Sequence, residues 1–215
     1  MVIDRPVYYW EVFSMFYTIA KLIGRVLFTL TGGIRISGKE RLPEKGPLII
    51  VCNHQSIIDP LVLLTFLPYR ITFLAAAYLF KIPLVGLILR AAGAMPIHSA
   101  KGDFKSLKES IKLLEKGGVL GIFPEGGVSL DGKLRPFMSG ASYIALKSGT
   151  AILPVALGGT RDVLPVGTYF PRRKRITINI GQTIMVERKD KIKRDDMTEL
   201  DLKLKEELQK LMDLI

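Results

Sequence analysis

Short unbroken runs of apolar residues alternate along the chain with segments in which apolar residues recur at helical spacing. The runs at 47–52 and 119–123 are too short for helices and read as buried strands. Strands are predicted at residues 34–38, 47–52, 71–76, 94–97, 119–123, 151–157 and 175–180. Helices are predicted at 60–67, 78–92, 103–116 and 140–148 and from Asp196 to the end. Alternating strands and helices predict an α/β fold with a mostly parallel sheet flanked by helices.

The N-terminal segment, residues 7–30, is apolar and rich in aromatic residues. Glu11, Lys21 and Arg25 interrupt it, so no uncharged run reaches the ~18–20 residues of a spanning helix. We expect one or two amphipathic helices that lie in a membrane interface, with Trp and Tyr at headgroup depth. The alternative is a helix packed on the domain's own core.

The contrast between the apolar, aromatic N-terminal segment and the alternating strands and helices that follow predicts two structural units. Residues 1–33 would be an N-terminal membrane-interfacial anchor, and residues 34–215 an α/β domain. The segment at 78–92 is also apolar and suits either a membrane- or acyl-chain-facing helix or a core helix.

The charge of the chain supports a membrane partner. The 215 residues carry a net charge of +11, 48% hydrophobic residues and a mean hydropathy of +0.29. This combination is typical of a protein with apolar surface and a basic side, as expected at an anionic membrane. Nucleic acid, the other usual partner of a basic chain, is not predicted here.

Much of this charge is concentrated at residues 158–194, which hold ten Lys or Arg residues against three acidic ones. The segment suits a patch for anionic lipid, CoA phosphates or an acidic carrier protein, and equally a solvated loop and strand edge. A single cysteine, Cys52, excludes an intrachain disulfide and fits a reducing compartment. We therefore expect the protein at the cytoplasmic face of the cell membrane. With only two histidines, a structural zinc site is not expected.

A polar segment, residues 53–59, directly follows the buried strand at 47–52. Pro60 disfavours helical geometry at Asp59 and suits a first helical position, so Asp59 is predicted to be a helix N-cap. His54 then lies in the loop, where the Asp59 carboxylate can reach the imidazole. A carboxylate on one ring nitrogen fixes the tautomer and lets the other nitrogen take a proton from a hydroxyl. The alternative is that Asp59 only caps the helix.

A second polar segment, Pro124-Glu125-Gly126-Gly127, follows the strand at 119–123. Its glycines let the backbone approach a ligand closely, and successive N–H groups can bind an anionic oxygen. The alternative is a tight turn with a surface glutamate. Because the carboxyl ends of parallel strands share an edge, the loops after residues 52, 97 and 123 can form one site. The loop after residue 97 begins at His98, which suits a phosphate donor, a second acid or an ordinary loop residue.

These segments belong to a recognisable series of motifs. In order, they are Asn53, His54 and Asp59 as N-H-x-x-x-x-D; residues 123–126 as F-P-E-G; residues 132–137 as G-K-L-x-P-F; and Leu153-Pro154-Val155. On these motifs the chain resembles the glycerolipid acyltransferase family, and it is most similar to the bacterial 1-acyl-glycerol-3-phosphate (lysophosphatidic acid) acyltransferases. The resemblance covers about residues 35–185.

The resemblance implies a glycerol-3-phosphate acyltransferase-like fold and direct acyl transfer, without a cofactor, a metal or a covalent enzyme intermediate. His54, oriented by Asp59, would deprotonate a lysophospholipid hydroxyl. That hydroxyl would attack the thioester of acyl-CoA or acyl-carrier protein and give phosphatidic acid. Asn53, Glu125 and the backbone of Gly126-Gly127 would bind the acceptor.

Three cations that are common in the family are missing. Their positions are held by Ala75-Ala76-Ala77, by Ser99 and by Val128. Lys101, Lys133 or Arg135 can substitute from neighbouring positions in binding the acceptor phosphate. Otherwise the acceptor is a different lyso-lipid. The non-enzyme alternative is a catalytically inactive lipid-binding module.

Overall fold

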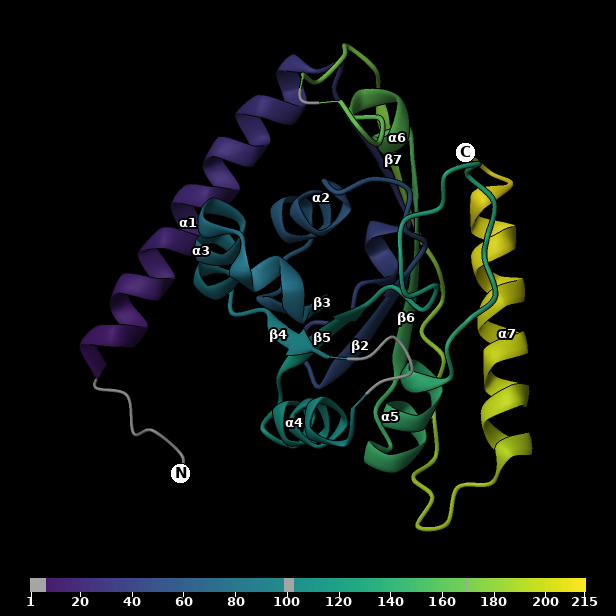
Figure 1. The fold of residues 1–215 in the computed structure, drawn as a ribbon. Helices are drawn as coiled ribbons and strands as arrows, with labels where there is room; N and C mark the ends of the chain where they lie inside the picture. Colours follow the sequence, from purple (N-terminus) through teal and green to yellow (C-terminus); the bar gives the residue numbers. More distant parts are fainter. Residues whose placement is uncertain (1–6, 99–102, 169) are drawn as a thin grey trace.

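A computed structural model of the chain describes residues 7–98, 103–168 and 170–215. Lys101 therefore lies outside the described residues. Figure 1 shows a central twisted sheet with helices on both faces and the long N-terminal helix along one side.

Within the described residues, one seven-stranded sheet has the order β1-β7-β6-β2-β5-β3-β4. The strands are β1 (Ile34–Ser37), β2 (Leu48–Cys52), β3 (Ile71–Ala76), β4 (Met95–Ile97), β5 (Val119–Ile122), β6 (Ile152–Gly158) and β7 (Ile176–Ile180). All neighbours pair in parallel except β6 and β7, which are antiparallel. The mostly parallel sheet predicted from the sequence is confirmed.

The helices form two layers. The α-helices are α1 (Val7–Leu30), α2 (Asp59–Phe66), α3 (Pro83–Ala91), α4 (Phe104–Glu115), α5 (Gly140–Ser148), α6 (Thr160–Val163) and α7 (Arg194–Met212), with short 3₁₀ turns at η1 (Lys39–Arg41) and η2 (Ala77–Lys81). One core cluster joins the sheet to α1 and α2, and the other joins it to α4, α5 and α7. Helices therefore cover both faces, as a fully buried parallel strand requires.

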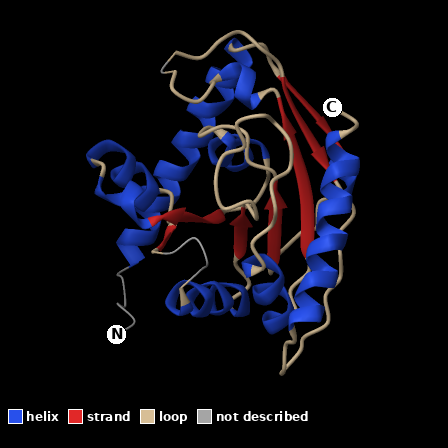
Figure 2. Ribbon diagram, turned by 45° about the vertical axis from the view of Figure 1, so that its right-hand side comes forward, coloured by secondary structure: helices blue, strands red, loops and turns tan. Residues whose placement is uncertain are grey.

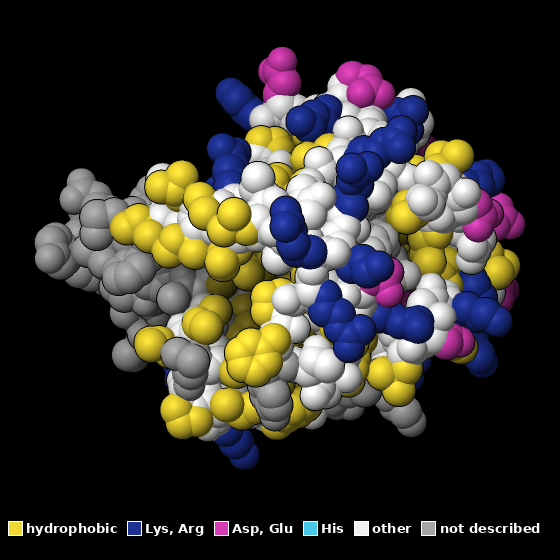
Figure 3. Space-filling view, turned by 90° about the horizontal axis from the view of Figure 1, so that it is seen from above, with side chains coloured by type: hydrophobic (Ala, Val, Ile, Leu, Met, Phe, Trp, Pro, Cys, Tyr) yellow, Lys and Arg dark blue, Asp and Glu magenta, His cyan; other side chains and the backbone are white. Residues whose placement is uncertain are grey.

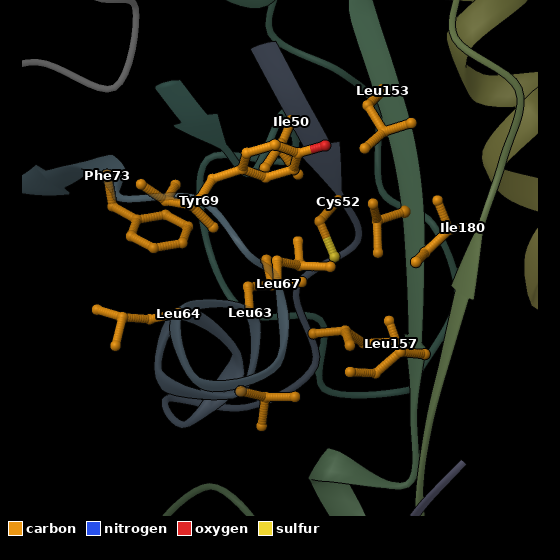
Figure 4. Close-up of a cluster of buried hydrophobic side chains, with 14 of the residues drawn as sticks. Ile50, Cys52, Leu63, Leu64, Leu67, Tyr69, Phe73, Leu153, Leu157 and Ile180 are labelled. Atoms are coloured by element: carbon orange, nitrogen blue, oxygen red, sulfur yellow. The ribbon is translucent and has the colours of Figure 1, made fainter. Parts of the chain in front are cut away.

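Strand β2 shows how one strand serves both layers. Ile50 and Cys52 point into the cluster with Leu63 of α2 and Leu67, which directly follows α2 (Figure 4). The alternate residues of the strand, Ile49 and Val51, belong to the other cluster, with α5 and α7. Successive side chains of a strand point to opposite faces, so an unbroken apolar run is what this position needs.

Three predicted details differ in the structure. The helix expected at 78–92 is divided into η2 and α3, because Ile82 is extended before Pro83 begins a new helix. Phe104, expected on the inner face of α4, is 79% exposed. Helix α7 begins at Arg194, not Asp196, because the Asp196 carboxylate reaches back to accept the Lys193 N–H at 2.7 Å.

The N-terminal segment forms a single helix, α1, which packs on α2 along one face. Tyr17 donates a hydrogen bond to the Tyr69 carbonyl at 2.7 Å, and Lys21 donates one to the Leu67 carbonyl at the end of α2 at 2.8 Å. Burial, and then the nearby charge of Arg25, lower the pKa of Lys21. This face therefore matches the core-packed alternative.

The opposite face of α1 is apolar and exposed. Its exposed residues are Ile19, Leu22, Ile23, Val26, Leu27 and Leu30, of which Leu30 is 65% exposed. Among the described helices, none combines the length and hydropathy needed to cross a bilayer. Membrane contact by α1, and the division into residues 1–33 and 34–215, remain predictions.

The contact between α1 and α2 depends on a glycine. A Cβ at Gly24 would overlap Thr65 Oγ1 on α2. We expect Gly24→Leu to push the helices apart and to lower the free energy of unfolding by about 1–3 kcal/mol. Urea unfolding measures this change. The control is Gly140→Ala at the start of α5, where an added Cβ meets nothing within 4 Å. Equal stability of the two variants would contradict the close packing.

Candidate active site

The loops that follow the parallel strands gather at the carboxyl edge of the sheet (Figure 2). Asn53, the first residue after β2, is buried there. Its side-chain oxygen accepts the Leu157 N–H at 2.7 Å, and its side-chain nitrogen donates to the Leu157 carbonyl at 2.9 Å. The amide thus ties the ends of β2 and β6 together. Contact between Asn53 and a substrate remains a prediction.

His54 and Asp59 are in contact, as their spacing predicts. His54 Nδ1 lies 2.8 Å from Asp59 Oδ2, which also accepts the N–H groups of Gln55 at 2.6 Å and Ser56 at 2.8 Å. The prediction that Asp59 is the helix N-cap is wrong. Ile58 is in the cap position, and Asp59 is the first residue of α2. Its carboxylate caps the preceding loop, because the loop N–H groups converge on it before the helix begins.

The His54 ring is held in place by aromatic stacking. It stacks on Phe123 with 4.1 Å between ring centroids, and Phe123 stacks in turn on Phe73 at 5.8 Å. The His54 side chain is 16% exposed, and the Asp59 side chain is fully buried. Nε2 of His54 has no hydrogen-bond partner in the described part of the chain. The arrangement leaves one ring nitrogen available to a substrate while the other is fixed.

Glu125 connects the two polar segments. It is only 2% exposed. One carboxylate oxygen accepts the His54 N–H at 2.8 Å, and the other accepts the Arg135 N–H at 2.9 Å. Burial raises the pKa of this carboxyl, and the two N–H groups oppose that rise. In this structure Glu125 therefore positions the loop backbones. Its predicted contact with the acceptor remains a prediction.

Gly126 and Gly127, the glycines of the second polar segment, have other residues close to their backbone, as expected. Gly126 has φ +68°, and a Cβ there would lie 2.6 Å from Met138 Sδ. A Cβ at Gly127 would lie 3.2 Å from a guanidinium nitrogen of Arg135. Arg135, one of the predicted substitute cations, thus lies along this backbone. Lys133 is exposed, and its N–H donates to Asp131 at 3.0 Å.

His98, at the end of β4, has a partner of its own. Its Nδ1 lies 3.3 Å from Asp103 Oδ2, and its backbone N–H donates to the same oxygen at 2.9 Å. These bonds and the Ser106 N–H lower the pKa of Asp103 to about 2. Asp103 is also the N-cap of α4, directly before the helix that is predicted to begin at this residue. The exposed pair therefore closes the start of α4, which favours the ordinary loop reading of His98.

The structure also adds a cation that the motifs do not mark. Arg161 follows β6 at the carboxyl edge, and a Cβ at Gly132 would lie 3.1 Å from one of its guanidinium nitrogens. In the sequence it is only one of ten basic residues at 158–194. Its position at the end of a predicted strand is the signal that singles it out.

Comparison with known proteins agrees with this arrangement. A family model described as Acyltransferase matches residues 33–158. The chain belongs to this acyltransferase family. Its fold is similar to the crystal structure of the 1-acyl-sn-glycerophosphate (LPA) acyltransferase PlsC from Thermotoga maritima, with a TM-score of 0.76 and 25% identity. That alignment covers 99% of this chain and 84% of the other.

Two proteins that are similar to this chain in sequence are named 1-acyl-sn-glycerol-3-phosphate acyltransferases. LPAT1, chloroplastic, from Arabidopsis thaliana is 35% identical over 153 residues, covering 70% of this chain and 43% of the relative. The Borreliella burgdorferi protein is 30% identical over 169 residues, covering 78% and 68%. The chain thus spans less than half the length of the chloroplast relative.

The double role of Glu125 can be tested by its removal. Glu125→Ala leaves the buried N–H groups of His54 and Arg135 without their acceptor. We expect the free energy of unfolding to fall by about 2–4 kcal/mol. Chemical denaturation provides the measurement. Asp131→Ala is the control, because Asp131 also accepts two hydrogen bonds in this loop but is exposed. If Glu125→Ala lowers the free energy of unfolding no more than Asp131→Ala does, Glu125 does not hold the two loops together as described.

Proposed function

We propose that the protein transfers a fatty acyl group from acyl-CoA or acyl-carrier protein to the free hydroxyl of 1-acyl-sn-glycerol-3-phosphate. The product would be phosphatidic acid for phospholipid synthesis. The observation that carries the proposal is the 2.8 Å contact between His54 and the buried Asp59 carboxylate. The names of the relatives support the choice of acceptor.

The mechanism follows from the two ring nitrogens. His54 Nε2 takes the proton of the acceptor hydroxyl as its oxygen attacks the thioester carbonyl. Asp59 stays ionised and stabilises the imidazolium. The tetrahedral intermediate then expels the thiolate, which takes the proton from Nε2, so the products are an ester and a free thiol. No cofactor or covalent enzyme intermediate is needed.

The missing family cations favour a second candidate. With Ala75-Ala76-Ala77, Ser99 and Val128 at the usual cationic positions, the same chemistry can serve a different lyso-lipid. A panel of lyso-lipid acceptors decides between the two. Faster turnover of a phosphate-free lyso-lipid would favour the second candidate.

We also propose that the enzyme acts at the cytoplasmic face of the cell membrane, as a monotopic or peripheral protein. The exposed apolar face of α1 supports this, as do exposed apolar residues of η2 and α3, among them Tyr78, Leu87 and Ile88. Hydrophobic side chains gather on the α1 side of the molecule, next to a surface rich in Lys and Arg (Figure 3). Such a border between apolar and basic surface suits an anionic bilayer.

The catalytic pair can be tested with lysophosphatidic acid and acyl-CoA. We expect His54→Ala to lower kcat by about 10²- to 10⁴-fold, because the acceptor loses its general base. Asp59→Asn should cause a loss of similar size, because it disturbs the tautomer. His98→Ala is the matched control and should keep kcat within about twofold. Full activity of the His54 variant would exclude the assignment of the base.

Membrane contact can be tested with sedimented vesicles that contain anionic phospholipid. Leu22, on α1, is 64% exposed, and Leu202, on α7, is 58% exposed. Leu22→Glu places a charge in the proposed lipid-facing surface and should weaken binding by about tenfold or more. Leu202→Glu makes the same change on α7, which covers the opposite face of the sheet from α1, and should bind as the wild type does. Equal binding of both variants would refute this orientation of α1.

A further inference from the structure

Residues 158–164 are held beside the His54 loop at both ends. At one end, the Asn53 side chain makes two hydrogen bonds with the Leu157 backbone. At the other end, Ser56 Oγ donates to the Leu164 carbonyl at 2.8 Å. Arg161 lies between these two attachments, so the fold fixes its backbone next to residues 53–56.

The Arg161 side chain points toward the same loops. Gln55 Nε2 donates to the Gly132 carbonyl at 3.2 Å. A Cβ at Gly132 would lie 3.1 Å from a guanidinium nitrogen of Arg161 and 3.8 Å from Gln55 Nε2. The guanidinium and the Gln55 amide thus meet at Gly132, in the loop that follows the second polar segment, and Gln55 is the direct neighbour of His54.

The charge of Arg161 is not neutralised by a neighbouring acid. The side chain is half-buried, and no ion pair joins it to an acid in the described part of the chain. Arg135 lies along Gly127 in the same loop, and its guanidinium also has no ion pair among the described residues. Two guanidinium groups therefore border the backbone between Gly127 and Gly132. A guanidinium fork can bind phosphate oxygens in pairs.

We infer that Arg161, from the segment after β6, binds the phosphate of the acceptor, with Arg135 beside the same loop at Gly127. This inference rests on the proposed function, because it assumes that His54 acts on a phosphorylated lyso-lipid. The phosphomonoester is then held by residues that the family motifs do not mark, in place of the three absent cations. Arg161 thereby selects acceptors with a phosphomonoester headgroup.

The test measures KM and kcat of Arg161→Ala for lysophosphatidic acid and for acyl-CoA. Loss of a charge-assisted hydrogen bond should raise KM for lysophosphatidic acid by about 10- to 100-fold. kcat should change by less than about threefold, and KM for acyl-CoA should stay the same. Arg161→Lys should recover part of the loss, because it restores the charge without the fork.

Arg188→Ala is the matched control. It removes one arginine from the same basic segment, but Arg188 packs near Gly149 at the end of α5, away from the His54 loop. Its KM for lysophosphatidic acid should equal that of the wild type. A second measurement uses glycerol 3-phosphate as a competitive inhibitor, with glycerol as the phosphate-free probe. Arg161→Ala should weaken inhibition by glycerol 3-phosphate and leave any effect of glycerol unchanged.

The inference and the proposed function fail in different ways. If the wild type acylates lysophosphatidic acid and Arg161→Ala keeps its KM, the inference is overturned and the proposed function stands. A rise in KM for acyl-CoA alone would also overturn it, because Arg161 would then bind the donor's phosphates. A fall in kcat with both KM values unchanged would mean a structural role and overturn it as well. If the wild type does not acylate lysophosphatidic acid, the proposed function itself fails.

Discussion

Asp59 places a fully buried carboxylate where β2 ends and α2 begins, and three donors converge on one of its oxygens. A buried charge is costly unless hydrogen bonds satisfy it. The N–H groups of Gln55 and Ser56 can reach it only if the loop backbone turns around the carboxylate. The same turn brings Nδ1 of His54 within 2.8 Å. The conformation of the loop and the orientation of the His54 ring therefore have one cause.

The surrounding loops fix the position of this turn in the sheet. Glu125 holds the His54 backbone from the side of β5, and Asn53 holds the end of β2 against β6. Both contacts join segments far apart in the chain, across 71 and 104 residues. Most of the polar side chains at this edge thus satisfy backbone groups. Among the described residues, Nε2 of His54 and the guanidinium groups of Arg135 and Arg161 have no hydrogen-bond or ion-pair partner and are available to a substrate.

The sequence predicts the local parts of this arrangement well. A short apolar run predicts β2. Pro60 and the five-residue spacing between His54 and Asp59 predict that these two side chains can meet. The sequence does not show that Asp59 is already helical, because aspartate is common both at the N-cap and in the first turn of a helix. Arg161 is missed for a different reason. Its position after a predicted strand is a signal, but nine other basic residues share the segment 158–194. The tertiary contacts of residues 157 and 164 that hold it at the site leave no periodic pattern in the sequence.

Helix α2 carries Asp59 at its first residue, and the hydrogen bonds from Tyr17 and Lys21 of α1 reach the chain just beyond its last residue. Eight helical residues span about 12 Å. In the proposed orientation, α2 separates His54 from α1, the helix proposed to face the lipid. A lyso-lipid hydroxyl near the headgroup layer can then reach the base while its acyl chain stays in the leaflet. Under the proposed membrane orientation, the length of helix α2 would set the depth at which acyl transfer takes place.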